Sequence, residues 1–175
     1  SEMRIVREDG SDAAPGEVGE IAGHSPLLMP GYYRRDDLTA AAIRDGWLYT
    51  GDLGYVDDEG FLFLVDRKKD MIDSGGVKVY PRDIEEIAAR HPAVREVAVF
   101  GVPHDKWGET PCAFVELKAG AQTTPEDIVA HCKKHLAGFK VPRAVVFGEL
   151  PKTSTGKIQK FELRKQAGSA AAINV

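Results

Sequence analysis

The chain has 175 residues, of which 43% are hydrophobic and 29% are charged, so a packed globular core is expected. Its 23 basic and 27 acidic side chains give a formal net charge of −4, which argues against a nucleic-acid-binding protein with a basic face. No apolar run approaches the ~20 residues of a membrane span. Cys112 and Cys132 fit neither a disulfide framework nor a metal site, so a reduced, cytoplasmic protein without a metal centre of its own is expected.

The first third of the chain is predicted to be rich in β-structure. Residues 3–7 alternate apolar and polar side chains, and residues 17–22 form a second candidate strand. Residues 38–43 fit a short helix. Residues 47–56 and 61–65 flank a turn that contains aspartate and glycine, which predicts a β-hairpin.

From about residue 66 onward, the pattern alternates between strands and helices. Residues 71–72 and 77–80 flank a Gly-Gly pair and predict a two-stranded ribbon. Three longer apolar runs, at residues 94–102, 113–117 and 144–147, predict the strands of a sheet.

Three helices are predicted in the same part of the chain. The first begins at Pro81 and ends near Arg90, because proline suits the first position of a helix. The second follows a cap at Thr124 and is expected to end at Gly138. The third covers residues 161–166, and a frayed tail is expected at residues 168–172.

These elements predict an α+β fold in two parts. Residues 67–175 are expected to form a small C-terminal domain with a three-stranded sheet and helices. Residues 1–66 are short for a core of their own, and their β-pattern has no closing partner. They are therefore expected to be the β-rich end of a larger domain.

The segment between Pro151 and Ile158 places Lys157 directly after a glycine in a loop rich in threonine and serine. A P-loop would need glycine at position 151 and Ser or Thr at position 158, so that interpretation is excluded. A lysine on a mobile loop can bring positive charge to two anions that must react, such as a carboxylate and ATP. Asp52 can accept hydrogen bonds from ribose hydroxyls, and Arg67 can add a donor there.

Three motifs in order resemble those of the adenylate-forming enzymes, which include acyl-CoA synthetases, peptide-synthetase adenylation domains and luciferases. Residues 46–70 resemble the end of their large domain, residues 71–85 the start of their small domain, and residues 151–160 their terminal lysine motif. The resemblance covers nearly all of residues 1–167. It implies the C-terminal portion of an AMP-forming acyl-CoA synthetase, which joins a carboxylic acid to CoA through an acyl-AMP and uses ATP and Mg²⁺.

The resemblance assigns a role to each matching residue. Asp52 and Arg67 match the ribose-binding pair, Lys157 matches the lysine required for adenylation, and Lys69 matches the hinge of the small domain. Five residues match positions that contact CoA or its pantetheine arm: Gly75, Gly76, Trp107, Phe139 and Arg143. For the two aromatic residues, a plain core role stays open.

Three departures from the family pattern concern the pantetheine tunnel. Asp73 stands where Ile, Val or Lys is usual, Val77-Lys78 replaces a common Glu-Asn pair, and Val141 sits where some relatives have a basic CoA contact. The phosphate-binding loop, the adenine and magnesium motif and the acyl-pocket segments of the family do not occur in this sequence. We therefore expect ATP and Mg²⁺ to be bound mainly by the N-terminal domain of the same enzyme, and this chain alone to be inactive in adenylation.

The acid is not specified, because the residues that distinguish fatty, aryl and short-chain acids are not in the chain; fatty acid is expected from family frequency alone. Two other functions stay open: an adenylation domain that delivers to a carrier protein, and a standalone CoA-binding module. A carrier domain would follow the first, but the sequence ends at Val175, which favours a free CoA ligase. The partial β-region at residues 1–66 argues against the standalone CoA-binding module, because such a module would not carry half of another domain.

Overall fold

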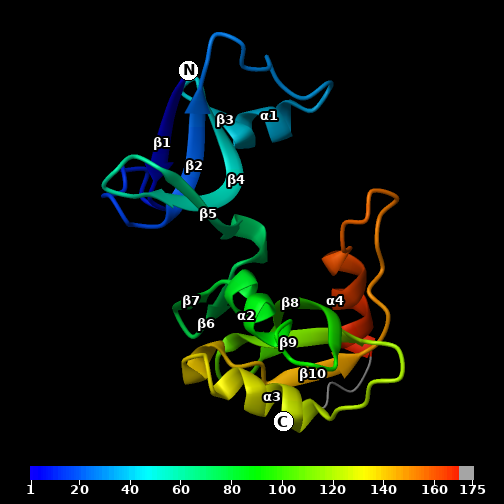
Figure 1. Ribbon diagram of the computed structural model, residues 1–175. Helices are drawn as coiled ribbons and strands as arrows, with labels where there is room; N and C mark the ends of the chain where they lie inside the picture. The colour runs from blue at the N-terminus through cyan, green and yellow to red at the C-terminus, as the bar shows by residue number, and fades with distance from the viewer. Residues whose placement is uncertain (170–175) are drawn as a thin grey trace. The chain divides into compact units, whose positions relative to one another are not determined.

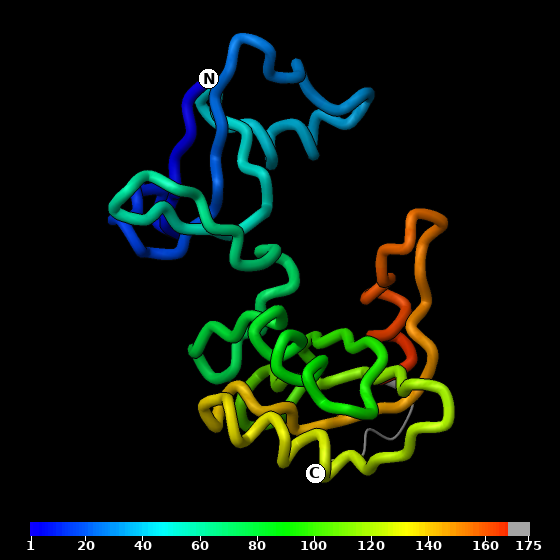
Figure 2. The backbone as a smooth tube through the Cα atoms, viewed as in Figure 1, coloured from blue at the N-terminus to red at the C-terminus, as the bar shows by residue number. Residues whose placement is uncertain are grey.

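The structure, a computed structural model, describes residues 1–169 and divides into two compact units, Ser1–Lys69 and the chain from Asp70 onward (Figure 1). The division falls after Lys69, whereas the sequence pattern placed the boundary after residue 66. The chain passes from one unit to the other once, through the 3₁₀ helix η1 (Lys68–Asp70) (Figure 2). Sheets and helices together make the fold α+β, as predicted.

The first unit is built on a five-stranded antiparallel sheet in the order β1-β2-β4-β3, with β5 also paired to β4. Its strands are β1 (Glu2–Val6), β2 (Gly19–His24), β3 (Ile43–Arg44), β4 (Trp47–Val56) and β5 (Leu62–Arg67). The short helix α1 (Asp36–Ala42) precedes β3 and buries no residue. The predicted hairpin is the β4–β5 pair.

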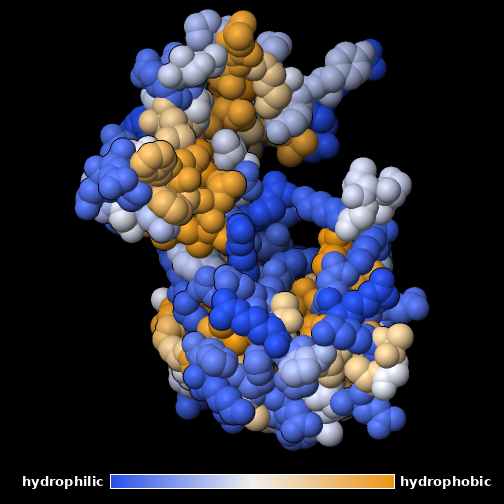
Figure 3. All heavy atoms as spheres, viewed as in Figure 1, coloured by the Kyte–Doolittle hydropathy of each residue, from blue (hydrophilic) through white to orange (hydrophobic). Residues whose placement is uncertain are grey.

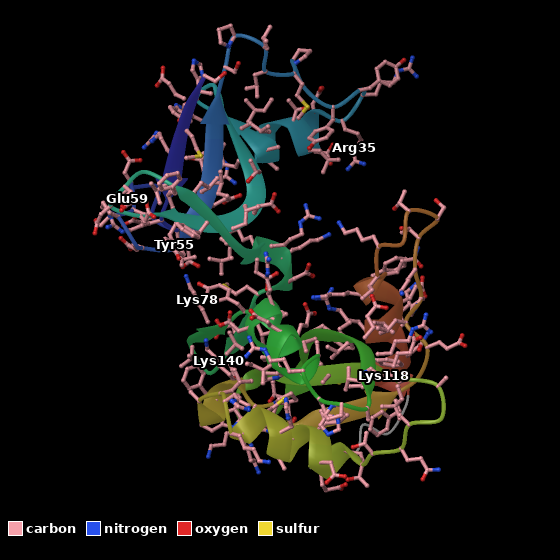
Figure 4. All side chains as sticks on the ribbon, viewed as in Figure 1. Arg35, Tyr55, Glu59, Lys78, Lys118 and Lys140 are labelled. Atoms are coloured by element: carbon pink, nitrogen blue, oxygen red, sulfur yellow. The ribbon has the colours of Figure 1, made fainter. Side chains whose placement is uncertain are left out.

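The first unit buries few apolar side chains. Its buried hydrophobic residues are Ile5, Val6, Ile21, Ala22 and Leu53. In contrast, the β5 region exposes an aromatic and aliphatic surface: Phe61, Leu62, Phe63 and Leu64. Figure 3 shows apolar atoms gathered on this unit, and Tyr55, labelled in Figure 4, stacks on Phe63 at a centroid distance of 5.0 Å.

The second unit contains the three predicted strands, β8 (Val94–His104), β9 (Gly108–Leu117) and β10 (Ala144–Phe147). β9 is central, with β8 antiparallel and β10 parallel to it. The predicted ribbon, β6 (Ile72–Ser74) and β7 (Val77–Val79), joins β9 through the pair Ser74 and Gly108. The sheet therefore has five strands rather than three.

Helices cover both faces of this sheet. Helices α2 (Pro81–Ala88) and α3 (Pro125–Lys133) pack into a cluster that contains Val99 of β8, whereas α4 (Lys160–Ser169) packs into a second cluster that contains Phe100. Successive side chains of a strand point to opposite faces. A strand buried on both faces therefore becomes a continuous apolar run, which explains the strong strand signals of this part of the sequence.

The helices of the second unit begin close to the predicted residues, but they end at other residues than predicted. Thr124 accepts a hydrogen bond from the Asp127 amide in a reciprocal capping box, as its position predicts. α3 ends at Lys133 rather than at Gly138, because residues beyond it form a turn and Gly138 begins a separate 3₁₀ helix, η2 (Gly138–Lys140). α4 includes two residues expected in the frayed tail, and positions 170–172 of that tail lie outside the described residues.

The two cysteines are free and buried. Burial raises the pKa of Cys112 and of Cys132 to about 11, so both thiols stay protonated near neutral pH. They lie in the clusters on opposite faces of the sheet, which supports a packing role for each. Within residues 1–169, no helix combines the length and apolar character needed to cross a bilayer.

Candidate functional site

Asp52 and Arg67 face each other on neighbouring strands of the first unit. They are register partners on β4 and β5, and Arg67 Nε donates a hydrogen bond of 3.1 Å to Asp52 Oδ1. The Arg67 side chain is 43% exposed and the Asp52 side chain 42%. An ion pair this exposed contributes at most about 1 kcal/mol to stability. The pair therefore remains accessible to a polar ligand such as a ribose.

A bulge in β4 presents Asp52. The register of β2 against β4 shifts between Glu20 and Ala22, and β4 inserts Thr50, Gly51 and Asp52 there. Gly51 adopts a φ of 74°, a conformation that glycine tolerates best. Thr50 Oγ1 donates to a β2 carbonyl at 2.9 Å and accepts from the Asp52 amide at 3.1 Å. The Thr-Gly-Asp sequence thus fixes where the carboxylate stands.

Glu20 anchors this bulge, and the sequence interpretation missed it. Its Oε1 accepts from the Gly51 amide at 3.1 Å, and its Oε2 accepts from Lys68 Nζ at 2.7 Å. The residue is only 9% exposed, so both charge-assisted contacts are partly shielded from water. The available signal was an acidic residue inside an otherwise apolar strand, which needs a partner when it is buried.

Lys157 lies at the end of a loop that is closed by its own hydrogen bonds. The Thr153 amide donates to the Lys157 carbonyl at 2.8 Å, and the Lys157 amide donates to Thr153 Oγ1 at 3.1 Å. Gly156 turns the chain with a φ of 83°. The Lys157 side chain is exposed and makes no hydrogen bond or ion pair with any other residue in the described range 1–169. The loop therefore presents an unpaired ammonium group.

The helix after this loop is tied firmly to the sheet and to α2. Leu163 of α4 is fully buried in the cluster against Phe100, and Ile158 packs against the same cluster. Lys160 forms an ion pair of 2.8 Å with Glu85 of α2, which also accepts from the Val99 amide at 2.8 Å. The loop that carries Lys157 thus starts and ends on a rigid base.

The structure brings Gly75 and Trp107 together. The Gly75 amide donates to the Trp107 carbonyl at 2.8 Å, and a Cβ added to Gly75 would lie 2.7 Å from Trp107 Cε3. Gly76, by contrast, has nothing within 4 Å of the corresponding position. Asp73, one of the departures from the family pattern, accepts from the Gly76 amide at 2.7 Å and so closes this turn. Trp107 is half-buried.

Phe139 and Arg143 lie on a different segment of the second unit, between α3 and β10. Phe139 is 47% exposed on η2, so the core role left open for it is not supported. Arg143 is also exposed, and its amide donates to the Pro111 carbonyl at 3.0 Å. Lys140, labelled in Figure 4, pairs with Asp83 of α2 at 2.6 Å and fixes η2 to that helix.

These residues fit parts of the expected ligands. The exposed carboxylate and guanidinium of Asp52 and Arg67 suit hydroxyl groups, and the free ammonium of Lys157 suits an anion. Among residues 1–169, no group of three or more His, Cys, Asp and Glu is arranged to hold a metal ion.

The chain as a whole is similar to several known proteins. Residues 83–157 match the family described as AMP-binding enzyme C-terminal domain. The chain is 45% identical over 166 residues to 2-succinylbenzoate--CoA ligase of Geobacillus sp. (strain WCH70), covering 94% of the chain and 34% of the relative. It is 49% identical over 160 residues to long-chain-fatty-acid--CoA ligase of Bacillus subtilis (strain 168), covering 91% of the chain and 29% of the relative.

A solved structure extends the match to three dimensions. Amide bond synthetase McbA from Marinactinospora thermotolerans superposes with a TM-score of 0.85 and 40% sequence identity, covering 95% of the chain and 34% of that protein. This chain spans about a third of the length of these relatives. Residues 83–157 therefore form an AMP-binding enzyme C-terminal domain, and the chain as a whole matches a C-terminal portion of larger adenylate-forming enzymes.

Proposed function

We propose that the chain is the C-terminal part of an AMP-forming acyl-CoA synthetase, which converts a carboxylic acid, ATP and CoA into acyl-CoA, AMP and pyrophosphate. The observation that carries this proposal is Lys157, an unpaired ammonium on a loop closed by its own hydrogen bonds and fixed to α4. The loop fixes the backbone of Lys157, and the side chain has no partner among residues 1–169. The similarity to two CoA ligases supports the same reaction class.

In the first half-reaction, a carboxylate oxygen attacks the α-phosphorus of ATP, an acyl-AMP forms and pyrophosphate leaves. Two anions approach each other in this step, so a cation that meets the developing charge lowers the barrier. Lys157 supplies that cation, and its flexible side chain lets it act as a point charge. Asp52 accepts hydrogen bonds from the ribose hydroxyls, and Arg67 fixes the Asp52 carboxylate. A bound Mg²⁺ would neutralise phosphate charge in this step.

In the second half-reaction, the CoA thiol attacks the acyl-AMP carbonyl and AMP leaves. Gly75 and Gly76 offer backbone without side chains, which lets a pantetheine arm approach closely. Trp107, Phe139 and Arg143 are the proposed contacts for the rest of CoA. The small domain turns at Lys69 between the two steps, so that one composite site performs both.

The proposed substrate is a carboxylic acid of unspecified class. The two curated relatives carry the names of different acids, 2-succinylbenzoate and a long-chain fatty acid, at similar identity to this chain. Adenylation also needs the phosphate-binding segments that precede these motifs in the family. We therefore propose that the 175-residue chain alone forms no acyl-AMP.

ATP–pyrophosphate exchange tests this proposal. The complete enzyme is expected to catalyse exchange with its acid, and the 175-residue chain is not. Lys157→Ala in the complete enzyme should lower exchange by about 10²–10³-fold, the range found when one charge-stabilising donor is removed. Formation of acyl-CoA from supplied acyl-AMP should persist. Lys134→Ala, at an exposed lysine after α3, is the matched control and should leave both steps unchanged.

Two results would contradict the proposal. Exchange by the chain alone, above the level without enzyme, would refute its inactivity. Equal loss of both half-reactions in Lys157→Ala would refute the division of labour, provided the variant keeps the wild-type unfolding transition.

A second candidate differs only in the acceptor. The 40% identity to an amide bond synthetase favours an amine as the group that attacks the acyl-AMP. Supplying the complete enzyme with acyl-AMP and either CoA or an amine discriminates between the two, because only the true acceptor should accelerate release of AMP.

A further inference from the structure

The first residue of η1 is tied to the first unit. Lys68 Nζ donates to Glu20 Oε2 at 2.7 Å, and the Glu20 side chain is only 10% exposed. Glu20 is itself held by the Gly51 amide, which donates to its other carboxylate oxygen at 3.1 Å. The carboxylate is therefore fixed on β2, and it holds the end of the Lys68 side chain against the sheet.

The last residue of η1 is tied to the second unit. Arg164 Nη2 donates to Asp70 Oδ1 at 3.1 Å, and the Asp70 side chain is 12% exposed. Arg164 lies on α4, and its guanidinium carbon is 5.8 Å from the ring centroid of the buried Phe100. Asp70 is therefore attached to the helix that follows the Lys157 loop.

Lys69, between these two residues, has no such attachment. Its side chain is exposed and forms no hydrogen bond or ion pair with another residue in the part of the chain that the structure describes. The division into two units falls directly after it. Each of its neighbours is thus held by a side-chain contact within a different unit, whereas no side-chain contact among the described residues holds Lys69 within η1.

We propose that Glu20 and Arg164 are positioning residues that confine the motion of the small domain to the backbone of Lys69. The inference rests on the proposed hinge role of Lys69. Peptide planes are rigid, so one residue offers two soft dihedral angles, φ and ψ. Turning at Lys68 or Asp70 instead would take a shielded carboxylate away from its cation, which is unfavourable. A one-residue pivot gives a small set of end positions, which suits an enzyme that alternates between two arrangements.

Residual dipolar couplings of backbone amides in the 175-residue chain test this inference directly. The amide planes of residues 68 and 69 precede the φ angle of Lys69, so their couplings should fit the alignment of the first unit. The amide of Asp70 follows the ψ angle of Lys69, so its coupling should fit the alignment of the second unit. The readout depends on orientation and requires no enzymatic activity.

Two variants each weaken one of the two side-chain contacts that flank Lys69. Lys68→Met should remove the amides of positions 68 and 69 from the first unit's alignment, and Asp70→Asn should remove the amide of position 70 from the second unit's alignment. Glu20→Gln keeps an acceptor for the Gly51 amide but loses the charge that holds Lys68, so it should reproduce the Lys68→Met result. Arg90→Met breaks an exposed ion pair with Glu86 on α2, is the matched control and should change none of these couplings.

The couplings can also overturn the inference. A single alignment that fits both units, or variants whose couplings at positions 68–70 equal those of the wild type, would exclude a pivot confined by these contacts. Wild-type dispersion of the amide shifts across β1 and β9 shows that each variant is folded. The outcome is independent of the proposed reaction, because the Lys157→Ala assays address catalysis and the couplings address only where the chain turns.

Discussion

Arg67 Nε donates a 3.1 Å hydrogen bond to Asp52 Oδ1 from the position directly opposite on the neighbouring strand. The other carboxylate oxygen, Oδ2, accepts no hydrogen bond from any residue in the range 1–169. The arginine thus holds the carboxylate by one oxygen and leaves the second open. That arrangement suits an acceptor whose ligand is a hydroxyl group.

Asp52→Asn in the complete enzyme is expected to raise KM for ATP more than it lowers kcat. A hydrogen bond to a charged group contributes about 1.5–3 kcal/mol, and about 1.4 kcal/mol corresponds to a tenfold change. The rise should therefore be about 10–100-fold. Arg67→Met should give a smaller rise, because it removes only the positioning of the carboxylate. Initial rates of pyrophosphate release against ATP concentration measure both effects.

The control for this prediction lies in the same unit. Arg4 pairs with Asp12 at 2.6 Å; the Arg4 side chain is 35% exposed and the Asp12 side chain 65%. Arg4→Met should leave KM for ATP unchanged. A comparable rise in Arg4→Met and Arg67→Met would mean that the effect comes from general surface charge rather than from ribose binding.

Gly75→Ala is expected to destabilise the chain more than Gly76→Ala. Both glycines have positive φ, 64° and 83°, so both substitutions cost about 1–2 kcal/mol of backbone strain. Only at Gly75 does the added Cβ meet the Trp107 ring, at 2.7 Å. Overpacking of this kind costs a further ~1–3 kcal/mol. Urea unfolding of the 175-residue chain measures the difference in the free energy of unfolding.

The pair of variants separates strain from the steric clash. Adding Trp107→Ala to Gly75→Ala should recover the part of the loss that the clash causes. Equal losses in the two single variants would show that the Trp107 ring moves away without cost. In that case the close approach of Gly75 and Trp107 would impose no constraint on this turn.

Much of the second unit could be predicted from the sequence because it is determined locally. Runs such as residues 97–100 are apolar on both faces, and the cap at Thr124 is encoded by residues next to it. The attachment of the ribbon to β9 was not predictable, because it depends on the single pair of Ser74 with Gly108. The extension of β9 back to Gly108 was missed for a similar reason, since that part of the strand is less apolar.

The candidate site shows the same division. Short motifs contain Lys157, Asp52 and Arg67, and the residue types of these motifs indicate the chemistry that they can perform. Glu20 and Arg164 do not, because their roles come from partners 48 and 94 residues away in the sequence. A side chain that acts on a distant segment leaves little local signal, so only the folded chain identifies it.

Lys69→Pro is expected to spare adenylation and to block thioester formation in the complete enzyme. Proline fixes φ near −65° and removes the amide hydrogen, so the small domain can no longer turn about the φ angle of this residue. Lys69→Ala is the matched variant and should keep both half-reactions, because the Lys69 side chain has no partner among the described residues. Exchange assays measure the first step, and acyl-CoA formation from supplied acyl-AMP measures the second. Loss of the second step in Lys69→Ala would show that the side chain, not the backbone, is required.

His91 is expected to make the stability of the second unit depend on pH. Burial lowers the pKa of His91 from 6.5, and the nearby His131, whose ring centroid is 5.3 Å away, lowers it further. Asp127 acts in the opposite direction and Lys118 in the same direction as His131. The net result is a folded state that prefers the neutral ring.

The direction in which stability changes with pH follows from the number of protons that each state binds. A histidine whose pKa is lower in the folded than in the unfolded state binds more protons when the chain is unfolded. Its contribution to stability is therefore present above the unfolded value of 6.5 and is lost as the pH falls through the lower folded pKa. Urea unfolding midpoints should fall between about pH 7.5 and about pH 5, and His91→Gln should reduce that fall. Carboxylates titrate alike in both proteins, so an identical pH dependence would show that His91 is protonated without cost in the folded state.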